Sequence, residues 1–141
     1  MSPVQTEVIR RKLSVIVNNL KALEPFDKIN ADDYAADLYR RKAVERLLQE
    51  LIEAAIDINT HIIVEAGGPV PDNYFDTFLR MGELGALSMV LARAIAPSAG
   101  LRNRLVHQYD ELDDRIILKA VELAQDQYAR YVKEIGTYLE R

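Results

Sequence analysis

The chain has 141 residues, enough for one domain, residues 1–141, with a single core, and its 49% hydrophobic and 28% charged residues are ordinary for a globular protein. Its net charge of −4 argues against nucleic-acid binding through bulk positive charge, although a local basic site remains open. The sequence has no cysteine, no signal-peptide pattern and no apolar run of membrane-spanning length, so we expect a cytoplasmic protein without disulfides, thiolate metal sites or membrane association.

The first half of the chain predicts two long helices. Ser2-Pro3 favours a helix start, because proline suits the first helical position, and Glu24-Pro25 interrupts the apolar stripe that follows. Asn30 is a plausible N-cap for a long second helix. Apolar residues with helical spacing continue until Gly67-Gly68-Pro69, which should end that helix.

The second half predicts shorter helices and then one long one. A loop at 69–73 precedes a short helix from Tyr74 to Glu83, and an apolar helix from Ala86 to Ala96 follows Gly85. Pro97-Ser98 breaks the pattern, with Ser98 as the expected cap of the next helix. The last helix should run from about Asp113 to Leu139.

The pattern as a whole predicts an all-α fold, because no β-alternating run occurs and the breaks between helices are short. The expected architecture is an antiparallel helical bundle of about four to six helices. The last helix carries several tyrosines on its apolar side. We expect these rings to pack in the core, with each hydroxyl reaching the rim.

The stretch from Arg102 to Tyr109 holds two guanidinium groups, an amide, an imidazole and a phenol. On a helix, Arg102 falls on the apolar face, while Asn103 and His107 share the adjoining face. An unpaired guanidinium is costly to bury. Arg102 should therefore face either an acidic partner, such as Glu53 or Asp57 on the long second helix, or an opening that binds an anion.

Two sequence runs carry a resemblance to a known family. Arg102-Asn103 and His107-x-Tyr109, with four residues between arginine and histidine, are similar to the Arg-x4-6-His-x-Tyr signature of HEPN domains. The run LRNRLVHQYDELDD and the preceding HIIVEAGGPVPDNYFDTFLRMGELGAL resemble the HepT-like family of HEPN ribonuclease toxins. The resemblance covers roughly Arg10 to Leu139. It departs mildly at residues 95–100, where a more regular helical approach to the arginine is expected.

The resemblance implies a metal-independent endoribonuclease that acts on RNA as a homodimer, with the signature helices of both subunits in one cleft. It also implies a partner, a minimal nucleotidyltransferase antitoxin of the MNT type. In the family this partner transfers AMP units onto the signature tyrosine and silences the nuclease. By position that residue is Tyr109, and the expected product of cleavage is a 2′,3′-cyclic phosphate.

The residues suit metal-free RNA cleavage, which needs a base, an acid and positive charge near the phosphate. His107 is the one histidine in the signature, and we assign the other, His61, a structural role. A single histidine does not easily serve as both acid and base, so a dimer with two copies of His107 agrees with the chemistry. Arg102 would hold the phosphate and Asn103 would orient His107 or the phosphate.

The remaining assignments are that Tyr109 offers a hydroxyl or a stacking face, and that Arg104 points away from Arg102 toward the surface or the RNA. No set of residues has metal-ligand spacing and no glycine-rich phosphate loop is present, so we expect neither a metal nor a cofactor.

Simpler readings stay open. Arg102 can be a plain salt-bridge partner, His107 a helix-end histidine and Tyr109 a packing residue. The basic clusters at 10–12 and 40–46 are expected to be solvated helix faces. The alternative functions are a non-catalytic HEPN module, which binds nucleotide or supports a nucleotidyltransferase as an accessory subunit, and a generic helical bundle.

Overall fold

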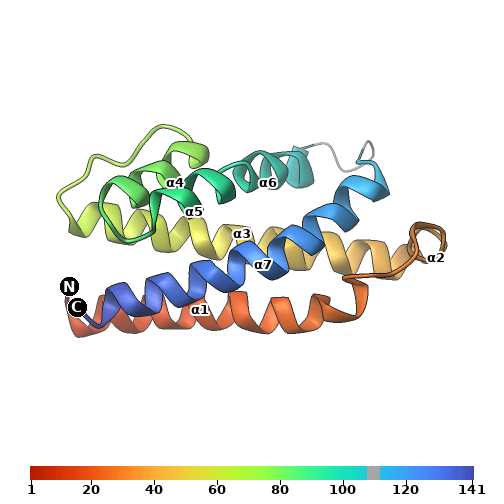
Figure 1. The fold of residues 1–141 in the computed structure, drawn as a ribbon, viewed down its shortest axis with the longest axis horizontal. Helices are drawn as coiled ribbons and strands as arrows, with labels where there is room; N and C mark the ends of the chain where they lie inside the picture. Colours follow the sequence, from red (N-terminus) through yellow and green to blue (C-terminus); the bar gives the residue numbers. More distant parts are fainter. Residues whose placement is uncertain (108–111) are drawn as a thin grey trace.

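The structure is a computed structural model that describes residues 1–107 and 112–141, and these residues form helices and no strand (Figure 1). The elements in chain order are α1 (Pro3–Leu23), the 3-10 helix η1 (Glu24–Phe26), α2 (Ala31–Ala35), α3 (Leu38–Glu65), α4 (Tyr74–Glu83), α5 (Met89–Ile95), α6 (Ser98–His107) and α7 (Asp114–Leu139). Helix α1 runs antiparallel to α3 and α7, and the chain returns along α3 through α4, α5 and α6. The predicted all-α bundle is confirmed.

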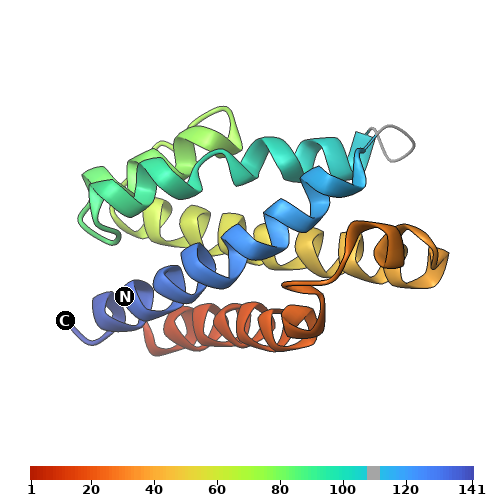
Figure 2. The ribbon, with the colours of Figure 1, turned by 45° about the vertical axis from the view of Figure 1, so that its right-hand side comes forward.

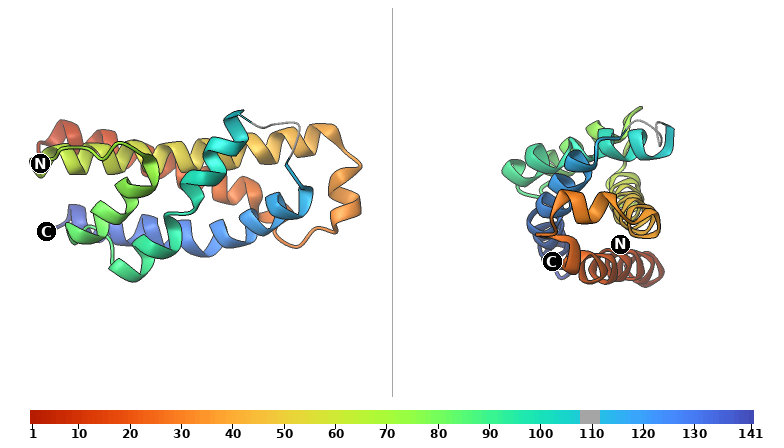
Figure 3. Two further views of the ribbon diagram at one scale, coloured as in Figure 1. Left: turned by 90° about the horizontal axis from the view of Figure 1, so that it is seen from above. Right: turned by 90° about the vertical axis from the view of Figure 1, so that its right-hand side faces the viewer.

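The helices form two layers around one core. Viewed from the end, α4, α5 and α6 cover one side of the pair α3 and α7, and α1 closes the other side (Figure 3). Helix α7 runs obliquely from beside the end of α6 to beside the start of α1 (Figure 2). Helix α6, which carries the signature residues, therefore rests on α3.

Helix α1 begins and packs as its sequence predicts. Ser2 and Gln5 form a reciprocal capping box, in which each side chain accepts a hydrogen bond from the backbone of the other. One face of the helix then carries Ile9, Ile16 and Leu23, which are fully buried in the common core.

The predicted long second helix is wrong in one respect, because two helices replace it. Asn30 does cap a helix, accepting a 2.7 Å hydrogen bond from the backbone of Asp32, but this helix is the short α2. The Asp37 side chain then accepts hydrogen bonds from the backbone amides of Tyr39 and Arg40 and starts α3. Two cap residues in close succession let the chain turn between α2 and α3, which the apolar period alone does not reveal.

The predicted stop after Ala66 is confirmed. Gly67 has a φ of 95°, and the amides of Gly67 and Gly68 donate to the carbonyls of Val64 and Ile63 at 3.0 and 2.8 Å. These two bonds are the Schellman pattern, which satisfies the last carbonyls of a helix and favours glycine at the left-handed position. The loop that follows carries the chain back to α4.

Helix α4 matches its predicted bounds, but the next helix is shorter than expected. It runs over Met89–Ile95 rather than Ala86–Ala96. Gly85 has a φ of 78°, and the amide of Ala86 donates back to Met81, so these residues still belong to the turn that ends α4. Ser88 caps the new helix through the amide of Leu91.

The tyrosines of α7 pack in the core as predicted, but two hydroxyls end in the interior and not at the rim. Tyr128 meets the Ser98 hydroxyl at 2.6 Å. Tyr131 donates to Asn59 Oδ1 at 2.6 Å and lies 3.0 Å from the Ala55 carbonyl oxygen. Burial raises the pKa of both tyrosine hydroxyls, so both stay neutral across the physiological range.

Candidate functional site

Helix α6 is anchored at its first residue. The Ser98 hydroxyl donates to the Ile95 carbonyl at 2.7 Å and pairs with the buried Tyr128 of α7. Ser98 is thus the first helical residue and not the N-cap that the sequence predicted, because its hydroxyl is taken by the preceding turn. The anchor fixes the helix that carries Arg102, Asn103, Arg104 and His107.

Arg102 lies on the covered face of α6, as the wheel predicted. Its side chain is 19% exposed, and the guanidinium Nη2 lies 3.6 Å from Glu53 Oε2 on α3. Of the two carboxylates that the sequence offered as partners, Glu53 is the one that pairs with Arg102. Asp57 instead binds Lys12 of α1 at 3.0 Å.

Two further contacts surround the guanidinium. Its Cζ atom lies 5.2 Å from the ring centroid of Tyr74, the first residue of α4. Its Nη1 donates to Asn103 Oδ1 at 3.3 Å. The Nε atom of Arg102 is buried and has no hydrogen-bond partner among the described residues. Arg102 is thus held on three sides, yet not all of its donors are used.

The carboxylate that faces Arg102 is itself held in place. Gln49, one helical turn earlier on α3, donates from Nε2 to Glu53 Oε1 at 2.7 Å. One carboxylate oxygen therefore faces the amide and the other faces the guanidinium. Glu53, oriented by Gln49, thus compensates the positive charge of Arg102 across α3 and α6.

The ring of Tyr74 is set by the start of α4 and by a buried hydrogen-bonded trio of Asn59, Thr77 and Tyr131. Asn73 caps α4 through the amide of Asp76 at 2.9 Å. The Thr77 hydroxyl donates to the Tyr74 carbonyl at 2.7 Å and accepts from Asn59 Nδ2 at 3.2 Å. Asn59 Oδ1 accepts in turn from Tyr131 of α7.

Asn103 and His107 are both exposed on α6, and His107 is the last residue of the helix. Asn103 accepts a hydrogen bond from Arg102, and no hydrogen bond joins the Asn103 and His107 side chains among the described residues, so the role of orienting His107 or a phosphate stays a prediction. Within the described residues, the side chain of His107 makes no hydrogen bond or ion pair. At about 100° per residue, His107 lies about 140° around α6 from Arg102.

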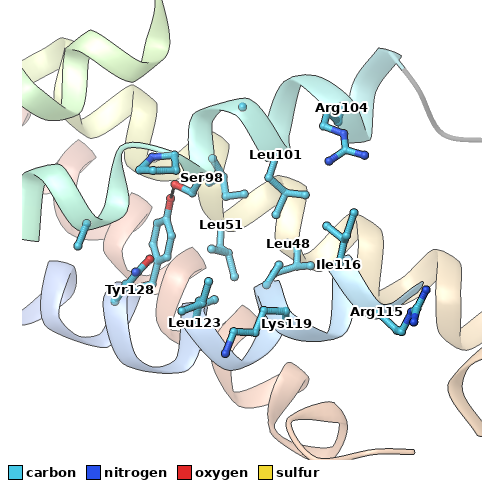
Figure 4. A pocket seen from close by; sticks show the side chains of 17 residues that line it. Leu48, Leu51, Ser98, Leu101, Arg104, Arg115, Ile116, Lys119, Leu123 and Tyr128 are labelled. Atoms are coloured by element: carbon cyan, nitrogen blue, oxygen red, sulfur yellow. Dashed lines mark hydrogen bonds between the residues drawn. The ribbon is translucent and has the colours of Figure 1, made fainter. Parts of the chain in front are cut away.

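Arg104 points away from Arg102, as predicted. It lines an apolar groove of about 680 Å³ between α3, α6 and α7, together with Leu48, Leu51, Leu101, Ile116 and Leu123 (Figure 4). Arg115 and Lys119 of α7 also line this groove, and none of its lining residues in the described part of the chain is a carboxylate. We call it the α6–α7 groove.

Tyr109, predicted as the modified or stacking residue, lies outside the described residues. The chain resumes at Leu112, and Asp113 caps α7 by accepting a 2.8 Å hydrogen bond from the Arg115 amide. Hydrogen bonds from Arg115 hold the pKa of the Asp113 carboxyl below its usual range. The last helix, α7, therefore runs from Asp114 to Leu139, within one residue of its predicted bounds.

The other basic clusters behave as solvated helix faces with local partners. Arg11 pairs with Glu7, Arg40 with Asp37 and Arg46 with Glu50, all along their own helices, while Arg41 reaches Asp114 of α7. Within residues 1–107 and 112–141, no group of three or more His, Asp or Glu side chains is arranged to hold a metal ion. None of the helices in those ranges is both long and apolar enough for a bilayer crossing.

Sequence reasoning missed Tyr74 and Gln49 as parts of this site. Tyr74 follows a capping asparagine and reads as an ordinary helix start. Its contact with Arg102 depends on how α4 folds back over α3, which no local pattern encodes. Gln49 had one available signal, its spacing of four residues from Glu53 on the same helix face.

Sequence comparison relates this chain to described nucleases. The family described as Ribonuclease HepT-like matches residues 16–135. A tRNA nuclease HepT of Aphanizomenon flos-aquae is 39% identical over 139 residues, which cover 99% of this chain and 95% of that protein. An mRNA nuclease HepT of Shewanella oneidensis is 24% identical over 129 residues, covering 92% and 96% of the two chains.

Structural comparison finds the same helical arrangement. The tri-AMPylated Shewanella oneidensis HEPN toxin, solved in complex with an MNT antitoxin, superposes with a TM-score of 0.82 at 23% identity, covering 97% of this chain and 99% of that one. A toxin–antitoxin structure with AMP-PNP gives a TM-score of 0.83 at 23% identity, covering 93% and 98%. These likenesses establish a shared fold.

Proposed function

Because this chain belongs to the HepT-like ribonuclease family, we propose that it is a metal-independent endoribonuclease and the toxin of a toxin–antitoxin pair. The observation that carries the proposal is the environment of the Arg102 side chain. This side chain is 19% exposed, is held by Glu53 and Tyr74, and has a buried Nε without a hydrogen-bond partner among the described residues, on the same helix as an exposed His107. RNA, a tRNA or an mRNA, is the proposed substrate.

In the proposed reaction the ribose 2′-oxygen attacks the neighbouring phosphorus. A base removes the proton of the 2′-hydroxyl, the bond from phosphorus to the 5′-oxygen breaks, and an acid protonates that leaving oxygen. The products are a 2′,3′-cyclic phosphate and a 5′-hydroxyl. Arg102 stabilises the negative charge on the phosphoryl oxygens, and His107 supplies the proton transfer.

One chain does not offer a complete site for this reaction. Arg102 is directed toward α3 and α4, and His107 lies about 140° around the helix from it. Base and acid are both needed in one turnover, and α6 supplies one histidine. A homodimer that brings two copies of α6 together would provide two histidines and two arginines in one cleft.

We assign the second copy to the α6–α7 groove. Leu123 and Ile116 both line the α6–α7 groove and are 44% and 39% exposed to solvent (Figure 4). Large apolar side chains that are exposed side by side often mark a binding surface. Along α7 these two residues and Ala120 form an outward stripe with helical spacing. A copy seated on this stripe would lie beside Leu101 and Arg104 of α6.

The order of the charges beside the stripe suits a twofold partner, which would compete with the exposed pairs that Lys119 makes with Glu122 and Asp126 makes with Arg130 within one chain. One side of α7 carries four charged residues, which in chain order are two cations, Arg115 and Lys119, and two carboxylates, Glu122 and Asp126. If two α7 helices pair antiparallel with the axis beside Ala120, each Arg115 faces an Asp126 and each Lys119 faces a Glu122. This order of charges is self-complementary, as an isologous interface requires.

The proposed antitoxin partner is an MNT-type nucleotidyltransferase that transfers AMP from ATP to Tyr109. Support comes from the similar folds solved as toxin–antitoxin complexes, one of them tri-AMPylated and one with AMP-PNP. Tyr109 follows His107 by two residues, so an attached AMP would bring a base and negative charge close to the histidine. The modification would block RNA and offer Arg102 a competing phosphate.

The alternative is a non-catalytic HEPN module, in which the Arg102–Glu53 pair is purely structural. The deciding experiment incubates the purified chain with RNA in EDTA and identifies the fragment ends. We expect cleavage with 2′,3′-cyclic phosphate ends, its loss in His107→Ala, and its retention in His61→Ala, a matched control on an exposed histidine of α3. Cleavage that survives in His107→Ala, or that requires added Mg²⁺, contradicts the proposal.

A further inference from the structure

Tyr74 contacts Arg102 of α6, whose side chain is 19% exposed, although nothing in the sequence linked the two residues. The guanidinium carbon lies 5.2 Å from the ring centroid, within the range of a cation–π contact. Tyr74 is 39% exposed, so this contact lies at the edge of the molecule and not in the core. Arginine stacks on aromatic faces through its flat guanidinium, which fixes the plane of the group.

The other contacts of Arg102 do not fix that plane. Glu53 lies at 3.6 Å, beyond the usual length of a hydrogen bond, so its attraction is mainly ionic. Asn103 accepts from a single nitrogen at 3.3 Å, and Nε has no partner among the described residues. One weak hydrogen bond and one ionic contact hold the guanidinium loosely, and the ring of Tyr74 adds a third contact to it.

The ring is not needed to hold α4. Asn73 caps the helix, Thr77 bonds to Asn59 in the core, and Phe78 and Met81 are fully buried. No hydrogen bond to the Tyr74 hydroxyl occurs among the described residues. The contact of the aromatic ring with Arg102 is therefore the interaction of Tyr74 that a leucine at this position would not make.

We propose that Tyr74 is a positioning residue that holds the Arg102 guanidinium, against the pull of Glu53, in the orientation that receives a substrate phosphate. The proposal rests on the proposed function, since it assigns Arg102 to the scissile phosphate. Two consequences follow. The arginine is pre-oriented in the free protein, and loss of the ring weakens RNA binding only while Arg102 is present.

The first test examines the free protein by NMR. The Cδ protons of Arg102 are expected to shift through the ring current of Tyr74, and the shift should disappear in Tyr74→Leu and remain in Tyr74→Phe. Phe75→Leu is the matched control, because Phe75 is the next residue on α4 and is 43% exposed. An Arg102 signal that does not respond to Tyr74→Leu overturns the proposal, whatever the protein does to RNA.

The second test is a double-mutant cycle of RNA binding in the cleavage-deficient His107→Ala background, with a fluorescent single-stranded RNA. We expect Tyr74→Leu to weaken binding about three- to tenfold, the range of a cation–π contact, and Tyr74→Phe to restore it. In Arg102→Ala the same change should have no further effect. Equal loss in both backgrounds means that Tyr74 acts on RNA by itself and overturns the positioning role. Absence of any RNA binding, with the NMR contact intact, counts against the proposed function instead.

Discussion

Arg102 and Arg104 lie two residues apart on α6 and serve opposite surfaces. Arg102 reaches back to Glu53 and Tyr74, whereas Arg104 lines the apolar groove beside α7. The helix therefore separates a covered cation, which the proposed reaction uses, from a cation at the proposed interface between subunits. Substitutions at the two positions should have different consequences.

Replacement of Arg102 should remove activity without unfolding the protein. Arg102→Ala deletes the phosphate-binding cation, and we expect RNA cleavage to fall by about 10²–10³-fold, the usual effect of losing one stabilising donor. Glu53 is 37% exposed and is solvated when the arginine leaves, so the melting temperature should change little. Arg93→Ala, on the exposed side of α5, is the control for loss of one positive charge. A similar loss in both variants would indicate a general charge effect.

Tyr109 should be the residue that the antitoxin modifies. Incubation with an MNT-type nucleotidyltransferase and ATP should add AMP masses to the wild-type chain and abolish its ribonuclease activity. Tyr109→Phe should gain no mass and keep its activity under the same conditions. Intact-mass spectrometry checks both, and modification of Tyr109→Phe to the same extent would assign the target to another residue.

The proposed interface predicts a charge-reversal rescue. Lys119→Glu places like charges opposite Glu122 of the second copy, so the dimer should weaken, and Glu122→Lys should do the same. Each single change also places like charges at positions 119 and 122 of one helix, so an unchanged helical spectrum is the control for both variants. The combined Lys119→Glu, Glu122→Lys chain restores opposite charges and should recover the dimer. Sedimentation velocity measures the three states.

Leu123→Asp provides the apolar test of the same surface, because it places a carboxylate in the groove. We expect a monomer with an unchanged helical spectrum and greatly reduced cleavage. A dimer that persists in Leu123→Asp and in both charge variants would move the interface to another face, while leaving the roles of Arg102 and His107 intact.

Glu45 should oppose stability at neutral pH. Burial, and to a lesser degree the nearby Asp114, raise the pKa of its carboxyl, against the lowering effect of Lys42 and Arg41. A carboxyl whose pKa is higher in the folded than in the unfolded state favours folding when protonated, and this contribution is lost as pH rises through the folded pKa.

Glu45→Gln should therefore melt at a higher temperature than wild type at pH 7. The difference should shrink as pH falls toward the ordinary glutamate value of 4.5. Thermal unfolding at a series of pH values checks the sign, and a lower melting temperature at pH 7 would contradict it.

The sequence predicts those parts of the fold that short-range rules govern. The capping serine before Pro3, the glycines after Ala66 and the bounds of α4 all follow from local chemistry, and each is confirmed. The division between α2 and α3 was missed because Asn30 and Asp37 both cap, and the apolar period does not show which cap starts the long helix.

The candidate site shows the same limit. The placement of Arg102 against an acidic residue of α3 follows from helical period and the cost of burying charge, and Glu53 confirms it. The sequence does not predict that Arg102 pairs with Glu53 and not with Asp57. Asp57 pairs instead with Lys12 of α1, which is remote in sequence. Tyr74 is likewise remote in sequence from Arg102, so their contact was not predicted either. Contacts set by the packing of three helices lie beyond what spacing along one helix can specify.

The buried trio of Asn59, Thr77 and Tyr131 has a consequence for how this sequence can evolve. Asn59 bridges the other two, donating to Thr77 and accepting from Tyr131, and each of the three sits on a different helix. Loss of the Thr77 or the Tyr131 hydroxyl leaves a buried polar atom of Asn59 without its partner, at a cost of about 1–3 kcal/mol. Neutral drift at these positions is therefore coupled, and the three should be exchanged as a set in distant relatives. Substitutions on α3, α4 and α7 are then linked through one buried side chain, Asn59.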